Sequence, residues 1–171
     1  MKVCVIHSIF PPYARGGAEQ VAFALARIWP DDEVFVISAA PFNGWVSFAG
    51  KWECNTDDAD LHADLRISVD QHESVDRRCI RIFRFTPFNL FTIFNIAKYP
   101  PLLRIIWHIL DMFNLHTYLV VRKILLREKP DIIITRNLKG LGYTIPVAIK
   151  NVKYKMKNLK WVHTIHDENL L

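Results

Sequence analysis

The chain has 171 residues, of which 51% are hydrophobic and 23% are charged, and its formal net charge at pH 7 is +5. This composition excludes a disordered tail, which would be far less hydrophobic, and a collagen-like chain, because the 6 Gly and 9 Pro show no period. A chain of this length can bury the core of one domain without disulfides. Three cysteines without a C-x-x-C spacing favour a reducing compartment over a disulfide framework or a cysteine zinc site.

The first forty residues predict a strand, a helix and a second strand. Residues 2–7 and 33–38 are short apolar runs rich in β-branched side chains, as in strands buried on both faces. Residues 17–29 predict a helix between them, with one apolar stripe: Val21, Leu25 and Ile28. The length of the connection favours a parallel pair with a right-handed crossover.

Residues 41–78 contain turn chemistry and predict irregular structure, apart from a short strand at 66–69. This region includes an acidic set with one histidine: Asp57, Asp58, Asp60, His62 and Asp64. The spacing of that set matches no calcium-binding loop, and we interpret it as a solvated loop rather than a metal site. Residues 79–85 alternate well enough to predict a further strand.

The second half of the chain continues the alternation of helices and strands. Residues 101–128 predict a strongly apolar helix with a break near Asn114. Its polar residues share one face: Arg104, His108, Asp111 and Arg122. Further elements are expected as a strand at 131–135, a helix at 140–151 and a strand at 160–165. The alternation predicts a single α/β domain built on an open parallel sheet with helices on both faces.

The distribution of apolar and basic residues bears on location. The charge-free stretch at 85–97, about 13 residues with a proline, is shorter than the roughly 20 that a spanning helix needs, so a soluble or peripheral protein is expected. Basic residues gather late in the chain: Lys150, Lys153, Lys155, Lys157 and Lys160. Together with the apolar region at 85–110 they suggest contact with an anionic membrane surface. A nucleic acid and a solvated loop are the alternatives.

Candidate ligand-binding residues lie at the ends of three predicted strands, where open α/β sheets bind ligands. The first loop ends in Gly16, Gly17 and Glu19 as a helix begins, which favours a phosphate or carboxylate, the alternative being a plain turn. Arg136 and Asn137 follow the strand at 131–135. No G-x-G-x-x-G follows the first strand, and no Walker loop supports ATP hydrolysis.

The last strand brings two histidines to its end. Alternation places His163 and His166 on opposite faces, which argues against one shared metal. We interpret His163 as a core residue and His166 as the site residue. Asp167 would orient His166 or accept a proton from a hydroxyl.

An ordered set of motifs then resembles a known family. The segments are the apolar run at 2–7, Phe10-Pro11-Pro12, Gly16-Gly17-Ala18-Glu19, Lys129-Pro130-Asp131-Ile132-Ile133, Asn137-Leu138-x-Gly140-Leu141-Gly142 and Val162-His163-Thr164-Ile165-His166-Asp167. This set resembles the N-terminal domain of glycosyltransferase family 4, the retaining enzymes of the GT-B fold. The likeness spans the chain and is loosest at residues 41–100.

The resemblance implies a Rossmann-like, acceptor-side domain that faces a second domain across an active-site cleft. It implies that Gly16 and Gly17 approach the diphosphate of a nucleotide-sugar donor and that His166 lies by the transferred sugar. It also implies a glycan or lipid-linked acceptor at the cytoplasmic membrane face and no cofactor or metal. Arg136 departs from the family, which often has His there.

The C-terminal donor-binding half of such enzymes is absent from these 171 residues. Either the chain is a fragment or the second half is a separate subunit, and the domain alone should be inactive. Its cleft face is then expected to expose apolar residues: Trp45, Phe48 and Trp52. The alternative function is a non-catalytic module that holds an acceptor or a partner at the membrane. A nucleic-acid-binding domain is the third hypothesis and depends on the basic stretch alone.

Overall fold

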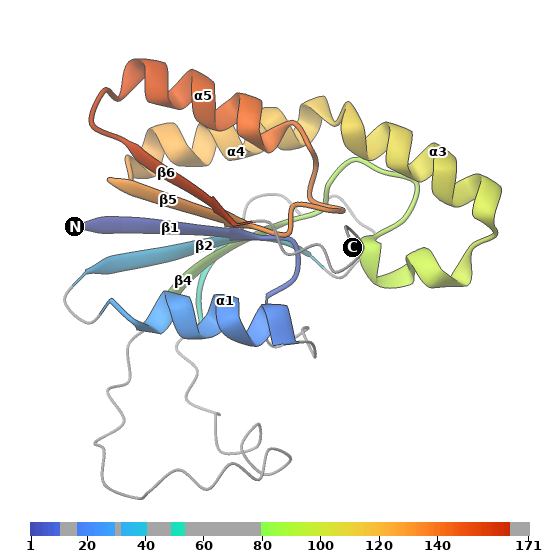
Figure 1. Ribbon diagram of the computed structural model, residues 1–171, viewed down its shortest axis with the longest axis horizontal. Helices are drawn as coiled ribbons and strands as arrows, with labels where there is room; N and C mark the ends of the chain where they lie inside the picture. Colours follow the sequence, from blue (N-terminus) through green and yellow to red (C-terminus); the bar gives the residue numbers. More distant parts are fainter. Residues whose placement is uncertain (11–16, 30–31, 41–48, 54–79, 165–171) are drawn as a thin grey trace, which may run out of the picture.

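A computed structural model describes residues 1–10, 17–29, 32–40, 49–53 and 80–164. Within these residues six strands form a sheet in the order β3-β4-β2-β1-β5-β6, in which all are parallel except β3, antiparallel to β4 (Figure 1). The strands are β1 (Lys2–His7), β2 (Glu33–Ala39), β3 (Ala49–Glu53), β4 (Ile80–Phe85), β5 (Ile132–Arg136) and β6 (Lys160–Thr164). The expected α/β fold is confirmed, and it is Rossmann-like.

Helices cover both faces of the sheet, as expected. The helices of the described residues are α1 (Gly17–Arg27), the short 3-10 helix η1 (Ile93–Lys98), α3 (Pro101–Met112), α4 (Leu115–Glu128) and α5 (Ile145–Lys155). Figure 1 shows α1 beneath one face and α4 with α5 over the other, while α3 projects beyond the sheet on the side where the parallel strands end. No helix in the described segments has both the length and the hydropathy needed to cross a bilayer.

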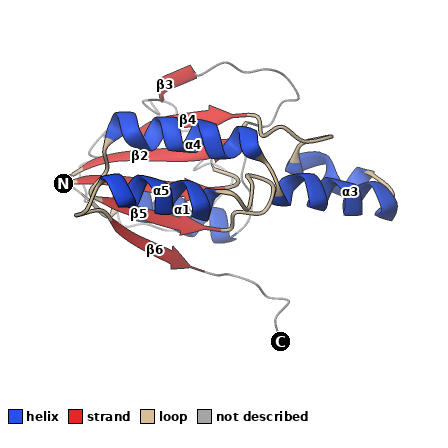
Figure 2. Ribbon diagram, turned by 90° about the horizontal axis from the view of Figure 1, so that it is seen from above, coloured by secondary structure: helices blue, strands red, loops and turns tan. Residues whose placement is uncertain are grey.

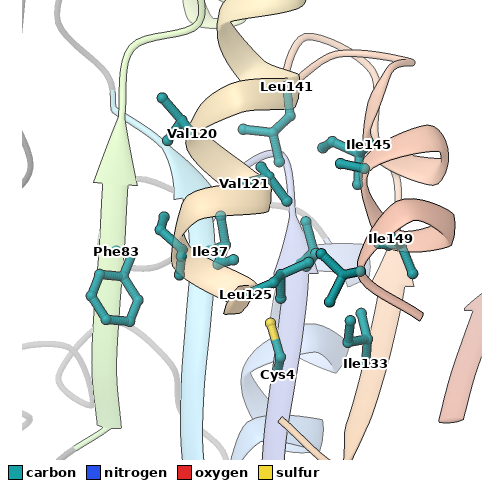
Figure 3. Close-up of a cluster of buried hydrophobic side chains, with 14 of the residues drawn as sticks. Cys4, Ile37, Phe83, Val120, Val121, Leu125, Ile133, Leu141, Ile145 and Ile149 are labelled. Carbon is teal, nitrogen blue, oxygen red and sulfur yellow. The ribbon is translucent and has the colours of Figure 1, made fainter. Parts of the chain in front are cut away.

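The larger core lies between the sheet and the helices α4 and α5. Cys4 and Ile6 of β1 point to this side, where Leu125 of α4 and Ile149 of α5 are fully buried (Figure 3). On the other face of β1, Val5 belongs to a smaller core between the sheet and α1. Because β1 is covered on both faces, its continuous apolar run is what a central parallel strand requires.

The face of α1 that packs on the sheet differs from the predicted stripe. Ala22 and Ala26 are buried there, whereas Val21 and Ile28 are exposed and Leu25 is half-buried. The small alanines let the helix lie close to the sheet, and Phe23 packs against the same core from the side. The predicted apolar stripe was therefore wrong for this helix.

Three other element predictions have clear outcomes. The break near Asn114 is confirmed, because its side chain accepts the amide hydrogen of Thr117 at 3.0 Å and caps α4. The helix expected from residue 140 begins only at Ile145, because Gly140 and Gly142 have φ angles of +80° and +125°. Strand β3 lies in a region predicted to be irregular, and the short strand expected at 66–69 lies outside the described residues.

Candidate functional site

The order of the strands reverses between β1 and β5. From β1 the chain passes through α1 to β2 on one side, and from β5 it passes through α5 to β6 on the other. Helices α1 and α5 lie on opposite faces of the sheet (Figure 1). The carboxyl ends of two such strands form the topological switch point, where open α/β sheets bind their ligands.

Two basic side chains end the strands at this switch point. His7 is the last residue of β1, Arg136 is the last residue of β5, and the two are partners in the parallel register. Both side chains are buried, His7 completely. The imidazole Nδ1 lies 2.7 Å from the carbonyl oxygen of Ile9, which fixes the orientation of the ring. Arg136 was among the predicted site residues, whereas His7 was recognised only as the start of the first strand end and was given no role, although its place at the end of a buried strand was the available signal.

Backbone hydrogen bonds join the ends of β1, β2 and β5. The amide of Ser8 donates to the carbonyl of Asn137 at 3.1 Å, and the amide of Ala39 donates to the carbonyl of Ser8 at 3.1 Å. The hydroxyl of Ser38 donates to the same Ser8 oxygen at 3.3 Å. Asn137 adopts a left-handed φ of 40°, which asparagine tolerates better than most residues, so the chain turns sharply after β5. These hydrogen bonds tie the carboxyl ends of β1, β2 and β5 together at the switch point.

The turn that follows β5 is anchored by Asp111 of α3. Its Oδ2 accepts the amide hydrogen of Gly140 at 2.9 Å, and its backbone carbonyl accepts that of Tyr143 at 3.2 Å. The side chain is fully buried, and burial raises the pKa of Asp111 to about 6, although the Gly140 amide and the charge of Lys139 oppose that rise. From the sequence, Asp111 was expected on the polar face of its helix, but the pattern did not show that this face is buried.

Gly140 and Gly142 serve this turn and not a dinucleotide. A Cβ added at Gly140 would lie 2.6 Å from the Cβ of Ile93, and one at Gly142 would lie 3.0 Å from Thr117 Cγ2. Both glycines also have positive φ angles. Packing and backbone conformation therefore explain both glycines without a ligand.

The helix start predicted to bind an anion is in place, because α1 begins at Gly17. A Cβ built on Gly17 would meet no atom within 4 Å, so packing against the described chain does not require glycine. Glu19 lies in the first turn of α1. The remaining candidates, Gly16, His166 and Asp167, lie outside the described residues, as do Trp45 and Phe48 of the predicted apolar cleft face.

His163 is not the core residue that the sequence predicted. It lies exposed on β6, and its Nδ1 is 2.8 Å from the hydroxyl oxygen of Thr135 on the neighbouring strand. The same Thr135 oxygen accepts a hydrogen bond from the indole of Trp161 at 2.9 Å. The His163 side chain therefore links β6 to β5 and does not belong to the core.

Metal-binding chemistry is not found in the described part of the chain, where no three His, Cys, Asp or Glu side chains gather closely enough to hold an ion. The acidic set at 57–64 lies outside that part. Cys4 is fully buried, and burial raises the pKa of its thiol, as in a structural cysteine.

Fold and site together define an α/β domain in which His7 and Arg136 end adjacent strands at the switch point of a largely parallel sheet. No protein family model matches the chain, and no solved structure matches it. A curated Klebsiella pneumoniae protein, described as "Uncharacterized 42.6 kDa protein in cps region", is 22% identical over 173 residues. The alignment covers 100% of the chain and 38% of that protein, so the chain spans less than half the length of the relative it matches.

Proposed function

We propose that this chain is the acceptor-side domain of a retaining glycosyltransferase. It would act with a donor-binding half to move a sugar from a nucleotide-sugar to a glycan or lipid-linked acceptor. The observation that carries the proposal is the switch point, where His7 and Arg136 end adjacent strands of a Rossmann-like sheet. The relative from a capsule (cps) region supports carbohydrate chemistry, because it aligns with the whole chain.

The chemistry needed at this edge is the binding of an anion and of hydroxyl groups. The amide groups of the first turn of α1 would face the donor diphosphate, with Gly16 and Gly17 admitting it closely. Arg136 would add positive charge, and Asn137 and Glu19 would bind hydroxyl groups of the acceptor. Preorganised donors of this kind can stabilise a departing diphosphate without a metal ion.

His166 and Asp167 follow β6 and would complete the site. In the proposed arrangement His166 contacts the transferred sugar, and Asp167 orients the imidazole or accepts a hydroxyl proton. The donor nucleotide binds mainly to the other half, which is either the continuation of this chain or a separate subunit. We place the protein at the cytoplasmic face of the membrane, where nucleotide-sugars and lipid-linked acceptors meet.

The test is transfer of a radiolabelled sugar from a panel of nucleotide-sugars to a lipid extract, with and without the donor half. Immunodetection of the native gene product first shows whether that half belongs to the same chain. We expect transfer only when both halves are present. His166→Ala should reduce it about 10- to 100-fold, as expected for a lost hydrogen bond to the sugar. His163→Ala is the matched control, since that exposed histidine lies three residues earlier, and it should change the rate less than about two-fold.

Two results would contradict the proposal. Transfer by the 171-residue chain alone would show that the donor half is not essential. Full activity of His166→Ala in the two-half system would remove the assigned role of the histidine. Acceptor binding with no transfer in either arrangement would favour the alternative, a non-catalytic module that holds an acceptor or a partner.

A further inference from the structure

Helix α3 has its polar side turned toward the protein and its apolar side turned outward. Trp107 and Asp111 are fully buried, and Arg104 and His108 are half-buried. The remaining positions of the helix are exposed and apolar: Pro101, Leu102, Leu103, Ile105, Ile106, Ile109, Leu110 and Met112. We call this set the outer α3 face. A helix on a globular protein ordinarily has the reverse arrangement.

Hydrogen bonds hold α3 in this orientation. The indole of Trp107 donates to the carbonyl of Phe91 at 2.6 Å, and the guanidinium of Arg104 donates to the carbonyls of Tyr99 at 2.7 Å and Ala97 at 3.0 Å. At the other end of the helix, Asp111 accepts the amide hydrogen of Gly140. Rolling the helix to bury its apolar side would break all of these bonds, each of which contributes on the order of 1 kcal/mol, so the outward apolar face is a built feature.

The apolar surface continues past the end of the helix. Phe113 and Leu115 are exposed by 74% and 65%, and Phe88 is exposed by 67%. The side-chain amide of Asn114 donates to the carbonyl of Phe88 at 3.0 Å, which holds that phenylalanine beside the junction of α3 and α4. Aromatic and aliphatic side chains therefore extend the outer α3 face into one larger surface.

Among the residues that the structure describes, the exposed charged side chains near this surface are positive. Between residues 86 and 127 the sequence has one carboxylate, Asp111, and that side chain is buried. Two cations belong to the segment that carries the surface, the exposed Lys98 and the half-buried Arg104. The other three cations of this stretch, Arg122, Lys123 and Arg127, lie on α4, which runs away from α3 toward Glu128 and its partner Lys2 (Figure 1). Lys139 is also exposed and lies near α3. Burial lowers the pKa of His108, and the positive charge of Lys139 lowers it further. An apolar face with cations nearby, and with no exposed carboxylate between residues 86 and 127, is complementary to anionic lipid.

We propose that the outer α3 face docks on an anionic membrane surface. At 1.5 Å per residue the 12-residue helix is about 18 Å long, too short to cross a bilayer, so it would lie in the interface with its apolar side among the acyl chains. Figure 2 shows α3 projecting beyond the strands, so the helix can enter the interface without obstruction by the sheet.

A second copy of the chain suits this face less well. In a symmetric dimer the same patch meets itself, which would bring the cations beside α3 toward their own copies. A membrane with anionic headgroups supplies apolar and negative partners together. Docking on lipid does not require sugar transfer, so a failure of the proposed function would not contradict it, and the two proposals are tested independently.

The test is co-flotation of the full 171-residue chain with lipid vesicles. One set contains phosphatidylcholine alone and the other contains about one third phosphatidylglycerol. We expect binding to the anionic vesicles that weakens with added salt, and binding at least about five-fold weaker to the neutral set, as for one or more lysines near the surface. Ile109→Glu should lower binding at least about ten-fold, because it places a charge among the acyl chains. Both Ile109 and the control position Val147 on α5 are more than half exposed, so neither substitution should alter folding.

The control variant Val147→Glu makes the same chemical change on a different helix and should bind as the wild type does. Circular dichroism and thermal melting would verify that both variants fold. Binding that is insensitive to Ile109→Glu would overturn the proposal, as would the absence of binding to either vesicle set. A dimer that Ile109→Glu dissociates, in a chain that ignores lipid, would assign the face to a second copy instead.

Discussion

Asp111→Asn would test how much ionisation of the buried Asp111 side chain lowers the free energy of unfolding. The carboxyl has no access to solvent, its Oδ2 accepts the Gly140 amide hydrogen, and its Oδ1 has no hydrogen-bond partner among the residues described. Asparagine keeps the shape of the side chain and an oxygen that can accept from Gly140, but it cannot ionise. The substitution therefore removes the ionisation and leaves the anchor of the turn.

The magnitude follows from the pKa. Burial raises the pKa of Asp111 from an ordinary 3.8 to about 6, a difference of roughly two units, and each unit corresponds to about 1.36 kcal/mol. The native state keeps its proton to a higher pH than the unfolded state does, so the free energy of unfolding falls as the pH rises from about 4 to about 6. Above that pH range the ionised Asp111 lowers the free energy of unfolding of the wild type by about 3 kcal/mol.

The assay is urea denaturation of the wild type and Asp111→Asn at about pH 4.5 and about pH 7.5, followed by circular dichroism. Other titrating groups act on both proteins alike and cancel in the difference. We expect the stability of Asp111→Asn relative to the wild type to rise by about 2 kcal/mol between the two conditions, because part of the cost is already present at the lower pH. A difference that is the same at both values, or that falls with pH, would refute the reasoning.

Three further substitutions test other parts of the structure. Gly17→Ala should change the free energy of unfolding by less than about 0.5 kcal/mol, because its Cβ would meet no described atom, yet lower sugar transfer in the two-half system if the glycine admits a phosphate. Gly140→Ala should lower the free energy of unfolding by about 2–4 kcal/mol, because it combines a positive φ with overlap on Ile93. Adding Ile93→Ala should recover part of that loss in the same denaturation assay, and no recovery would contradict the overlap. Glu128→Gln should lower the free energy of unfolding by about 2–3 kcal/mol. This is less than the loss expected for breaking a fully buried ion pair, because Arg127 is half-exposed.

Glu128 also predicts an acid limit with the opposite sign to that of Asp111. Burial raises the pKa of Glu128, but Lys2, Arg127 and Arg81 outweigh that effect and lower it below its ordinary 4.5. Its stabilising contribution is therefore complete above about pH 4.5 and is lost as the pH falls through the lowered value. In acid titrations followed by circular dichroism, Glu128→Gln should lack this loss. A wild-type and variant difference that stays constant on acidification would contradict it.

The strands were predictable because buried parallel strands carry a strong local signal. Residues 2–7 and 33–38 contain runs of β-branched and aromatic side chains, and β1 and β2 match them to within one residue. The helix faces were harder to predict. In α1 the sheet accepts Ala22 and Ala26, which a search for large apolar side chains passes over. In α5 the start moved to Ile145, since a Pro at the second position fits a first turn and two glycines precede it.

The orientation of α3 shows a different limit of sequence reasoning. The period of its polar and apolar residues was evident, but the period does not show which side points inward. Ordinary experience assigns the apolar side to the core, and here the polar side makes the tertiary hydrogen bonds. His7 was given no role for a related reason: its position at the end of a buried strand was visible in the sequence, but the pairing that places Arg136 beside it was not.

The central strand also has a consequence for biosynthesis. β1 pairs with β2 about thirty residues later, but its other edge pairs with β5, where Val3 lies opposite Ile132. At a synthesis rate of about 5–20 residues per second, that edge waits roughly 6–26 s for its partner to leave the ribosome. During this interval the nascent chain exposes an unpaired strand made almost wholly of apolar residues. Chaperone capture of nascent chains should therefore be strongest before residue 136 emerges, and a shorter path from β2 to β5 should reduce it.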